Sequence, residues 1–203
     1  LVEVQPGHTQ AHSTRLIIGP GTGLGVAGVF PGQHAWIPLP TEGGHVTFAP
    51  TDSTERALLD VFLQRHKRVS VERILCGQGL LELYQAYCTL EGMEPRFTSP
   101  AEVTTAANEG DSLATTALLR FLKILGDVCG DATLTMGARG GVYLCGGILP
   151  RLLEWLPKSE LREAFVNKGR MGTYNADIPV WVVTAPWTGL LGAAEALHNE
   201  EVF

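Results

Sequence analysis

The sequence has 203 residues, of which 45% are hydrophobic and 18% charged, and its formal net charge is −6. A chain of this length can build one substantial core, and this composition excludes a disordered protein. The negative charge, without a Lys/Arg cluster, argues against nucleic acid and anionic membrane as partners. No uncharged apolar run is long enough to span a bilayer.

The first fifteen residues are polar and contain Gly, Pro and His, with neither the apolar stretch nor the basic start of a secretory signal. This composition is typical of a linker between domains. We therefore expect residues 1–15 to be a linker that follows a preceding domain, and residues 16–203 to form one domain.

Three short strands are expected next, over residues 16–18, 25–30 and 34–39. The glycine-rich stretch 19–25 joins the first two strands, and a turn at residues 31–32 joins the last two. A glycine-rich loop that leads from strand to strand argues against Rossmann and Walker-type nucleotide sites, because both of those loops open a helix.

The middle of the chain is predicted to be helical. Apolar residues recur at helical spacing from residue 53 onward, and Ser53 or Thr54 can cap the first helix. A glycine break at residues 77–79 separates two further segments, and the pair Ser99-Pro100 starts another. Asp111 caps a long, mostly apolar helix, which we expect at the centre of the domain. The expected helices span residues 53–66, 71–75, 80–90, 99–108 and 111–136.

Strands and helices alternate in the last third of the chain. We expect strands over residues 141–145 and 179–184, and helices over residues 149–156, 161–165 and 189–198. Together with the earlier strands, this alternation predicts an α/β domain with a mixed sheet flanked by helices.

The four cysteines lie in apolar segments and form no C-x-x-C pair. We therefore expect them to be small buried side chains rather than metal ligands or redox groups. They are Cys76, Cys88, Cys129 and Cys145.

Two glycine-rich stretches are candidates for nucleotide binding. In G-P-G-T-G-L-G, residues 19–25, backbone N–H groups unshielded by side chains can cradle phosphate oxygens, and Thr22 adds a hydroxyl. An ordinary hairpin is the alternative. Gly146 and Gly147 end an apolar strand, where a flat ring or a ribose can lie against the backbone. The alternative there is that glycine serves only close helix–strand packing.

Three polar residues are candidates for binding a sugar. In T-E-G-G-H, residues 41–45, Glu42 and His45 flank two glycines on a tight turn, and a carboxylate beside an imidazole suits vicinal hydroxyls. A solvated glutamate and a surface or core histidine are the alternatives. A metal site is disfavoured because no third His or Cys stands at ligand spacing. Glu72 lies early in a short helix, which favours its ionised form, but taken alone it is only a helix-terminus glutamate.

Taken in order, six motifs of this sequence resemble those of the bacterial glucokinase family: G-x-G-T-G-L-G, E-G-G-H-V-x-F-A-P, V-S-x-E-R-x-L, G-G-V-x-x-x-G-G-I-x-P-R, F-x-x-K-G-R and G-L-L-G. The resemblance runs from about residue 16 to about residue 197. It implies a lobe of the actin/hexokinase/Hsp70 (ribonuclease H-like) superfamily. It also implies ATP-dependent phosphorylation of glucose to glucose 6-phosphate, at the entry to glycolysis, by a cytoplasmic homodimer that uses ATP and Mg²⁺.

The same resemblance implies a role for each candidate residue, and no metal ligand in this chain. Gly21, Thr22 and Gly23 would form the second phosphate loop. Glu42, His45 and Glu72 would hold the glucose hydroxyls. Gly146 and Gly147 would line the adenosine pocket.

The sequence also departs from the family pattern. Thr41 replaces the glycine usual before E-G-G-H, and Cys76 and Gln78 replace Ser and Pro in the L-S-G-P-G loop. The D-x-G-G-T phosphate loop and the N-D-F segment, whose Asp is the family's general base, do not occur. The resemblance therefore covers the C-terminal large lobe only, and we expect this chain to be inactive alone.

The family's last helix, over residues 189–198, reaches toward the N-terminal lobe. In this chain we expect its three leucines to be exposed or buried at a self-association contact. They are Leu190, Leu191 and Leu197.

Two other functions stay open on the sequence. One is another sugar kinase of the same superfamily, although the zinc-binding C-x-C-G-x-x-G-C-x-E stretch of the ROK group is absent. The other is a non-catalytic sugar-binding regulator, although the chain has neither a DNA-binding helix-turn-helix nor a basic surface.

Overall fold

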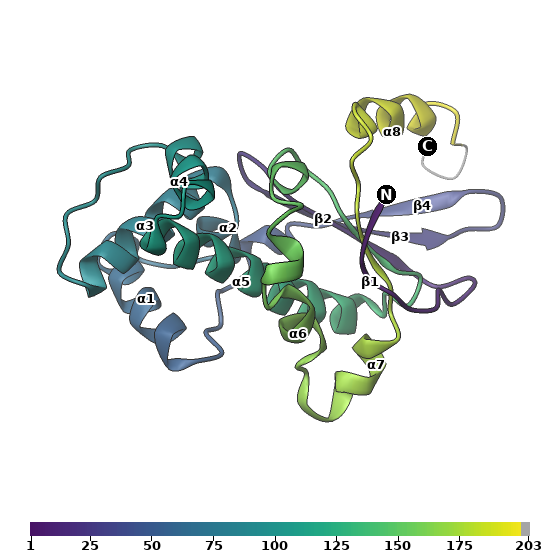
Figure 1. Ribbon diagram of the computed structural model, residues 1–203. Helices are drawn as coiled ribbons and strands as arrows, with labels where there is room; N and C mark the ends of the chain where they lie inside the picture. Colours follow the sequence, from purple (N-terminus) through teal and green to yellow (C-terminus); the bar gives the residue numbers. More distant parts are fainter. Residues whose placement is uncertain (200–203) are drawn as a thin grey trace.

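The computed structural model describes residues 1–199 and contains a six-stranded mixed sheet in the order β1-β6-β5-β2-β3-β4 (Figure 1). The strands β2, β3 and β4 form an antiparallel meander, and β5 and β6 run parallel to β2. The strands are β1 (Val2–Gln5), β2 (Arg15–Pro20), β3 (Leu24–Pro31), β4 (Trp36–Pro40), β5 (Val142–Leu144) and β6 (Val180–Val182). The predicted mixed sheet with flanking helices is therefore confirmed.

Eight α-helices are found among the described residues: α1 (Ser53–Leu63), α2 (Val71–Ile74), α3 (Gly77–Leu90), α4 (Pro100–Asn108), α5 (Ser112–Met136), α6 (Leu161–Val166), α7 (Gly172–Ala176) and α8 (Thr188–Ala196). The helices α1 to α4 gather on one side of the molecule, and α5 runs from that group to the sheet (Figure 1). Alternate residues of β2 and β5, such as Leu16 and Leu144, are fully buried in the core between the sheet and the helices.

The long helix α5 packs against α3, α4 and α6, as its nearly continuous apolar surface predicts. Its contact with α6 is unusually close. A methyl group added at Gly126 would strike the carbonyl oxygen of Leu161, and one added at Gly130 would lie 2.6 Å from the carbonyl oxygen of Phe165. The two helices therefore meet backbone to backbone at these two positions.

Three local predictions are wrong. Asp52, rather than Ser53 or Thr54, caps α1 by accepting a hydrogen bond from the N–H of Glu55. The predicted glycine break at residues 77–79 is the first turn of α3, which Cys76 caps. Residues 149–156 form no α-helix but two short 3-10 turns, at Leu149–Arg151 and Leu156–Lys158, each with a proline in its first turn.

Part of the expected linker belongs to the sheet. Residues 2–5 form the strand β1, which pairs antiparallel with β6 at the sheet edge. The side chain of Gln5 is buried and donates hydrogen bonds to the carbonyl oxygens of Asn175 and Ile178 at 3.0 and 2.7 Å. The division of the chain into residues 1–15 and 16–203 stays a prediction.

The helix α8 stands apart from the core, above β4 (Figure 1). None of its residues is buried. Leu190 and Leu191 of α8 are 69% and 64% exposed, and Leu197, directly after the helix, is 74% exposed. The predicted exposure of these three leucines is confirmed.

Candidate functional site

The three residues predicted to bind sugar lie together. Glu42 precedes the short 3-10 turn Gly43–His45 that follows β4, His45 ends that turn, and Glu72 lies in the first turn of α2. The imidazole Nε2 of His45 is 3.7 Å from Glu42 Oε2, and its Nδ1 is 3.7 Å from Glu72 Oε1. One imidazole thus stands between two carboxylates brought from distant parts of the chain.

This cluster is open to solvent on one side. The side chain of Glu42 is 90% exposed and that of His45 58%, whereas that of Glu72 is only 31% exposed. The carboxylate of Glu72 is fixed in place by β3, because its Oε2 accepts a hydrogen bond of 2.9 Å from the N–H of Leu24. Its Oε1 faces His45. Exposed carboxylate oxygens around an imidazole can bind a ligand that carries several hydroxyl groups.

The first glycine stretch lies directly beside Glu72. The N–H of Gly21 donates to the carbonyl oxygen of Gly23 at 2.8 Å, and the N–H of Gly77, at the start of α3, donates to that of Gly21 at 2.9 Å. Thr22 is exposed at the tip of the loop. A methyl group added at Gly23 would lie 2.6 Å from Glu72 Oε2. The carboxylate can therefore reach Leu24 only because residue 23 has no side chain.

The second glycine stretch meets the first at the ends of two adjacent parallel strands. The N–H of Cys145 donates to the carbonyl oxygen of Ile18 at 2.8 Å. Gly146 has φ +89°, and a methyl group added there would strike the carbonyl oxygen of Pro20. Gly147 is exposed, with nothing within 4 Å of the same position. Ligands of α/β sheets bind at the carboxyl ends of parallel strands, which is where these glycines lie.

The structure therefore brings together all the predicted site residues. Their individual roles stay predictions. No group of three or more His, Cys, Asp or Glu side chains suited to a metal ion is found within residues 1–199. The Mg²⁺ that the sequence resemblance implies therefore has no ligand assigned among these residues. The glycine stretches present backbone without side chains, which is the kind of surface that a nucleotide can approach closely.

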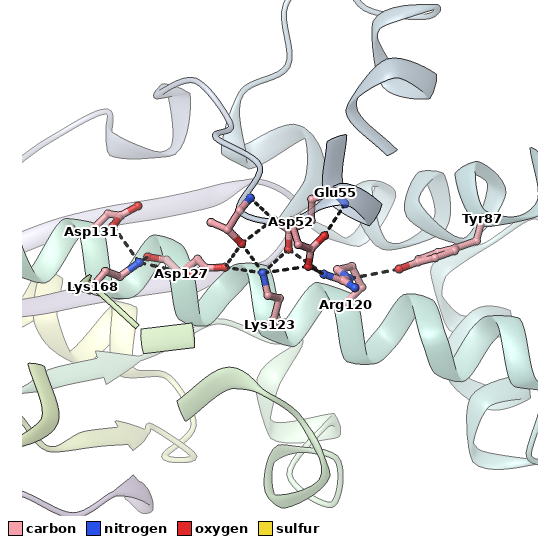
Figure 2. A network of polar contacts seen from close by, with 9 residues as sticks. Asp52, Glu55, Tyr87, Arg120, Lys123, Asp127, Asp131 and Lys168 are labelled. Atoms are coloured by element: carbon pink, nitrogen blue, oxygen red, sulfur yellow. Dashed lines mark hydrogen bonds and ion pairs between the residues drawn. The ribbon is translucent and has the colours of Figure 1, made fainter. Parts of the chain in front are cut away.

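A network of charged side chains around the buried Glu55 was not predicted from the sequence (Figure 2). Arg120 and Lys123 of α5 bind the carboxylate of Glu55, at 3.0 and 2.7 Å, and Glu55 is fully buried. Arg120 also binds Asp52. Farther along α5, Asp127 binds Lys123 at 3.0 Å and Asp131 binds Lys168 at 2.9 Å.

The network favours ionised carboxylates on α1. Burial opposes the charge of Glu55, but its hydrogen bonds to Lys123, the Thr51 N–H and Arg120 outweigh burial and lower its pKa. The pKa of Asp52 is lowered as well, because the N–H of Glu55 and the guanidinium of Arg120 outweigh the effect of its burial.

The network also anchors the loop that carries His45. The stretch 46–51 leads from the 3-10 turn to α1, and at its end Thr51 donates its N–H to Glu55 Oε2 at 2.7 Å.

The sequence did contain a signal for the charged residues that α5 contributes to the network. Charged residues at 120, 123, 127 and 131 interrupt an apolar helix at three- and four-residue spacing, which places them on one face. Their partners on α1 could not be read from that spacing.

Three cysteines are buried and Cys145 is partly buried, all as free thiols. Burial raises the pKa of the Cys76 and Cys145 thiols, which keeps them protonated and unreactive. The Cys76 sulfur accepts a hydrogen bond from the N–H of Gly79 at 3.3 Å. It thus caps the helix as a serine hydroxyl would.

No helix within residues 1–199 is long and apolar enough to cross a membrane.

Comparisons with known proteins agree on one family. The family model described as Glucokinase matches residues 1–200. The glucokinase of Chromohalobacter salexigens is 69% identical over 202 residues, which are 100% of this chain and 63% of that protein. The chain thus spans about three fifths of the length of this relative.

Solved structures agree with the sequence comparison. A glucokinase from an Antarctic psychrotroph has a TM-score of 0.92 and 34% identity, covering 98% of this chain and 62% of that one. A ROK family glucokinase from Streptomyces griseus, in complex with glucose and AMPPNP, has a TM-score of 0.58 at 18% identity and covers 92% of this chain and 61% of its own. At that identity the likeness shows the fold alone.

Proposed function

Because the chain belongs to the glucokinase family, we propose that it forms the glucose-binding lobe of an enzyme that transfers the γ-phosphoryl group of ATP to glucose. Its fold is that of the actin-like ATPase superfamily, a mixed sheet flanked by helices. The observation that carries the proposal is the contact of Glu42, His45 and Glu72 beside the two glycine stretches.

In this proposal the polar cluster binds the sugar. Glu72 uses one oxygen to accept from the Leu24 N–H, and its other oxygen is left for a glucose hydroxyl. A carboxylate accepts hydrogen bonds only, whereas an uncharged imidazole can donate from one nitrogen and accept at the other. Vicinal hydroxyls, each both donor and acceptor, match that combination.

The glycine stretches bind the nucleotide. The N–H groups of Thr22 and Gly23 face the phosphates, and Gly21 shapes this loop, because its N–H donates to the carbonyl oxygen of Gly23. The exposed backbone of Gly146 and Gly147 supports the adenosine. The Streptomyces griseus protein of similar fold, solved with glucose and AMPPNP, supports the idea that a protein of this fold binds both ligands. Mg²⁺, when bound with ATP, would offset the charge that develops on the transferred phosphoryl group.

The chain's own residues bind and orient, and none of them is assigned as the general base. The sequence contains no N-D-F segment and no D-x-G-G-T loop. Without a base, phosphoryl transfer slows by about 10²- to 10⁴-fold. We therefore propose that these 203 residues bind glucose without turning it over. A coupled assay that detects robust glucose-dependent ATP hydrolysis or transfer would refute this.

The direct test is a titration of the ¹⁵N-labelled chain with glucose, mannose and fructose. We expect glucose to bind most tightly and to shift the amides of His45 and Glu72. Glu72→Gln should weaken glucose binding by about tenfold to a hundredfold, since it removes a charged acceptor. Arg73→Ala, on the exposed neighbour of Glu72, is the control and should bind like the wild type. Tighter binding of mannose or fructose would favour another sugar kinase of the superfamily.

The cytoplasmic location and the homodimer implied by the sequence resemblance are also part of the proposal. The exposed leucines of α8 support self-association, because a soluble monomer rarely exposes several large apolar side chains on one helix.

A further inference from the structure

The loop of residues 41–47, the sugar-binding loop of the proposed function, is attached to its surroundings at two points. At its start, the Thr41 hydroxyl donates to the carbonyl oxygen of Val26 at 2.6 Å and accepts from the N–H of Gly43 at 3.3 Å. At its end, the Nη2 of Arg68 donates to the carbonyl oxygen of His45 at 2.8 Å and to the hydroxyl of Thr47 at 3.0 Å. The residues that carry Glu42 and His45 lie between these two attachments.

The second attachment joins the two parts of the sugar cluster, which are Glu42 with His45 on the loop and Glu72 on α2. Arg68 stands four residues before Glu72 in the same segment. Between them, the backbone of that segment pairs with the loop. The N–H of Phe48 donates to the carbonyl oxygen of Val69 at 3.0 Å, and the N–H of Val71 donates to that of Val46 at 3.0 Å. The guanidinium of Arg68 adds one further hydrogen bond to this pairing, to the carbonyl oxygen of His45.

We propose that Arg68 is a positioning residue for glucose binding, which fixes the distance between His45 and Glu72 before the sugar arrives. This inference rests on the proposed function. In this proposal Arg68 does not bind glucose or ATP itself, and it acts through the backbone carbonyl of His45. A loop that is already ordered loses less conformational entropy when it binds its ligand. The hydrogen bonds of Arg68 should therefore increase the affinity of the chain for glucose.

Arginine suits this position better than lysine. Its planar guanidinium can hold a carbonyl and a hydroxyl at once in a preorganised geometry, whereas an ammonium is a single point charge on a flexible stem. Arg68 is exposed, so its hydrogen bonds contribute little to the stability of the fold. Its removal should therefore change binding without unfolding the protein.

The test compares three variants of the ¹⁵N-labelled chain. Arg68→Ala should raise the Kd for glucose by about threefold to tenfold, as expected for loss of hydrogen bonds from a charged donor. Arg68→Lys, which keeps the charge, should recover part of this loss. Arg65→Ala is the matched control, because Arg65 is also exposed and its side chain donates to Gln85 on α3, at 3.0 Å, away from the loop. It should bind glucose like the wild type, and all variants should bind AMPPNP equally.

A second readout needs no ligand. The ¹H–¹⁵N heteronuclear NOE and hydrogen exchange of the Gly44 and His45 amides should show a more mobile loop in Arg68→Ala than in Arg65→Ala. Unchanged loop order, or an unchanged Kd for glucose, would overturn the inference. If the wild-type chain binds no glucose, the proposed function fails, and the loop measurement still decides whether Arg68 orders His45.

Discussion

The Oε2 atom of Glu72 accepts a hydrogen bond from the backbone N–H of Leu24 at 2.9 Å. Leu24 begins β3 directly after the glycine loop, so a single carboxylate connects the sugar cluster to the candidate phosphate loop. Its other oxygen faces His45 at 3.7 Å. A change that displaces this carboxylate should therefore affect glucose and nucleotide together.

Gly23→Ala should show this coupling. The added methyl group would lie 2.6 Å from Glu72 Oε2, so the carboxylate must move away from Leu24. We expect glucose binding to weaken at least about tenfold, since a charged acceptor is displaced, and AMPPNP binding to weaken as well. Calorimetric titrations with each ligand measure both effects.

The control for this change is Gly25→Ala, two residues farther along. Gly25 is exposed, has no positive φ and has nothing within 4 Å of the added methyl group. It should bind both ligands like the wild type. Equal losses in the two variants would show that glycine is needed for strand geometry here, and not for access of Glu72 to Leu24.

Gly146→Ala should destabilise the fold and weaken nucleotide binding. The residue has φ +89°, and its added methyl group would strike the carbonyl oxygen of Pro20. We expect a loss of about 2 kcal/mol or more in the free energy of unfolding, measured by urea denaturation. Gly147→Ala meets nothing within 4 Å and should be nearly neutral for stability. A neutral Gly146→Ala would contradict the close contact of the two glycine stretches.

Acid should destabilise the protein through the network on α1 and α5. The pKa of Glu55 is lowered from its ordinary value of 4.5 in the folded state, so the unfolded chain binds a proton at a higher pH than the folded one. The stability that this group contributes is present above about pH 4.5 and is lost as the pH falls through the folded pKa. Unfolding measured between pH 7 and pH 3 should follow that course.

Glu55→Gln separates this group from the other carboxylates. It leaves Arg120 and Lys123 without their buried partner, which should cost about 3 kcal/mol at pH 7. The loss of stability with acid should also become smaller than in the wild type. Glu109→Gln, on the exposed end of α4, is the control and should keep the acid dependence unchanged. An unaltered pH profile in Glu55→Gln would exclude the network as its source.

The exposed helix α8 predicts concentration-dependent association. Leu190 and Leu191 are 69% and 64% exposed side by side, and burying them in a second copy would remove apolar area from water. Changing both to Gln should lower the weight-average mass at high concentration in sedimentation equilibrium. If wild type and variant are both monomers at every concentration, α8 does not mediate a homodimer.

The sequence predicted the features that depend on neighbouring residues. The strand–glycine–strand hairpin at residues 16–30 and the helix start at Ser99-Pro100 follow local rules, and the structure has both. The capping box at Ser99 and Glu102 is such a local pattern as well. The cluster of Glu42, His45 and Glu72 came from a family resemblance, since their spacing in sequence gives no reason for contact.

The features that depend on distant residues were not predictable. Asp52, Ser53 and Thr54 are all competent caps, and Asp52 is held in place by Arg120, which is 68 residues away. The strand β1 needs β6 as its partner, near the other end of the chain. The absence of an α-helix over residues 149–156 has a local cause as well, because Pro157 disfavours helical geometry at Leu156. In addition, the indole N–H of Trp155 donates a hydrogen bond to the distant side chain of Asn108 at 2.9 Å.

The close crossing of α5 and α6 limits how this family member can change. At Gly126 the nearest atom is the carbonyl oxygen of Leu161, and at Gly130 the carbonyl oxygen of Phe165 is close as well, behind the Lys168 side chain. Every residue type at 161 and 165 carries such an oxygen. No substitution at 161 or 165 can therefore make room for a larger residue on α5. In a genetic selection, a strain damaged at Gly126 should recover by reversion of the same codon, because no second-site suppressor on α6 can relieve the clash.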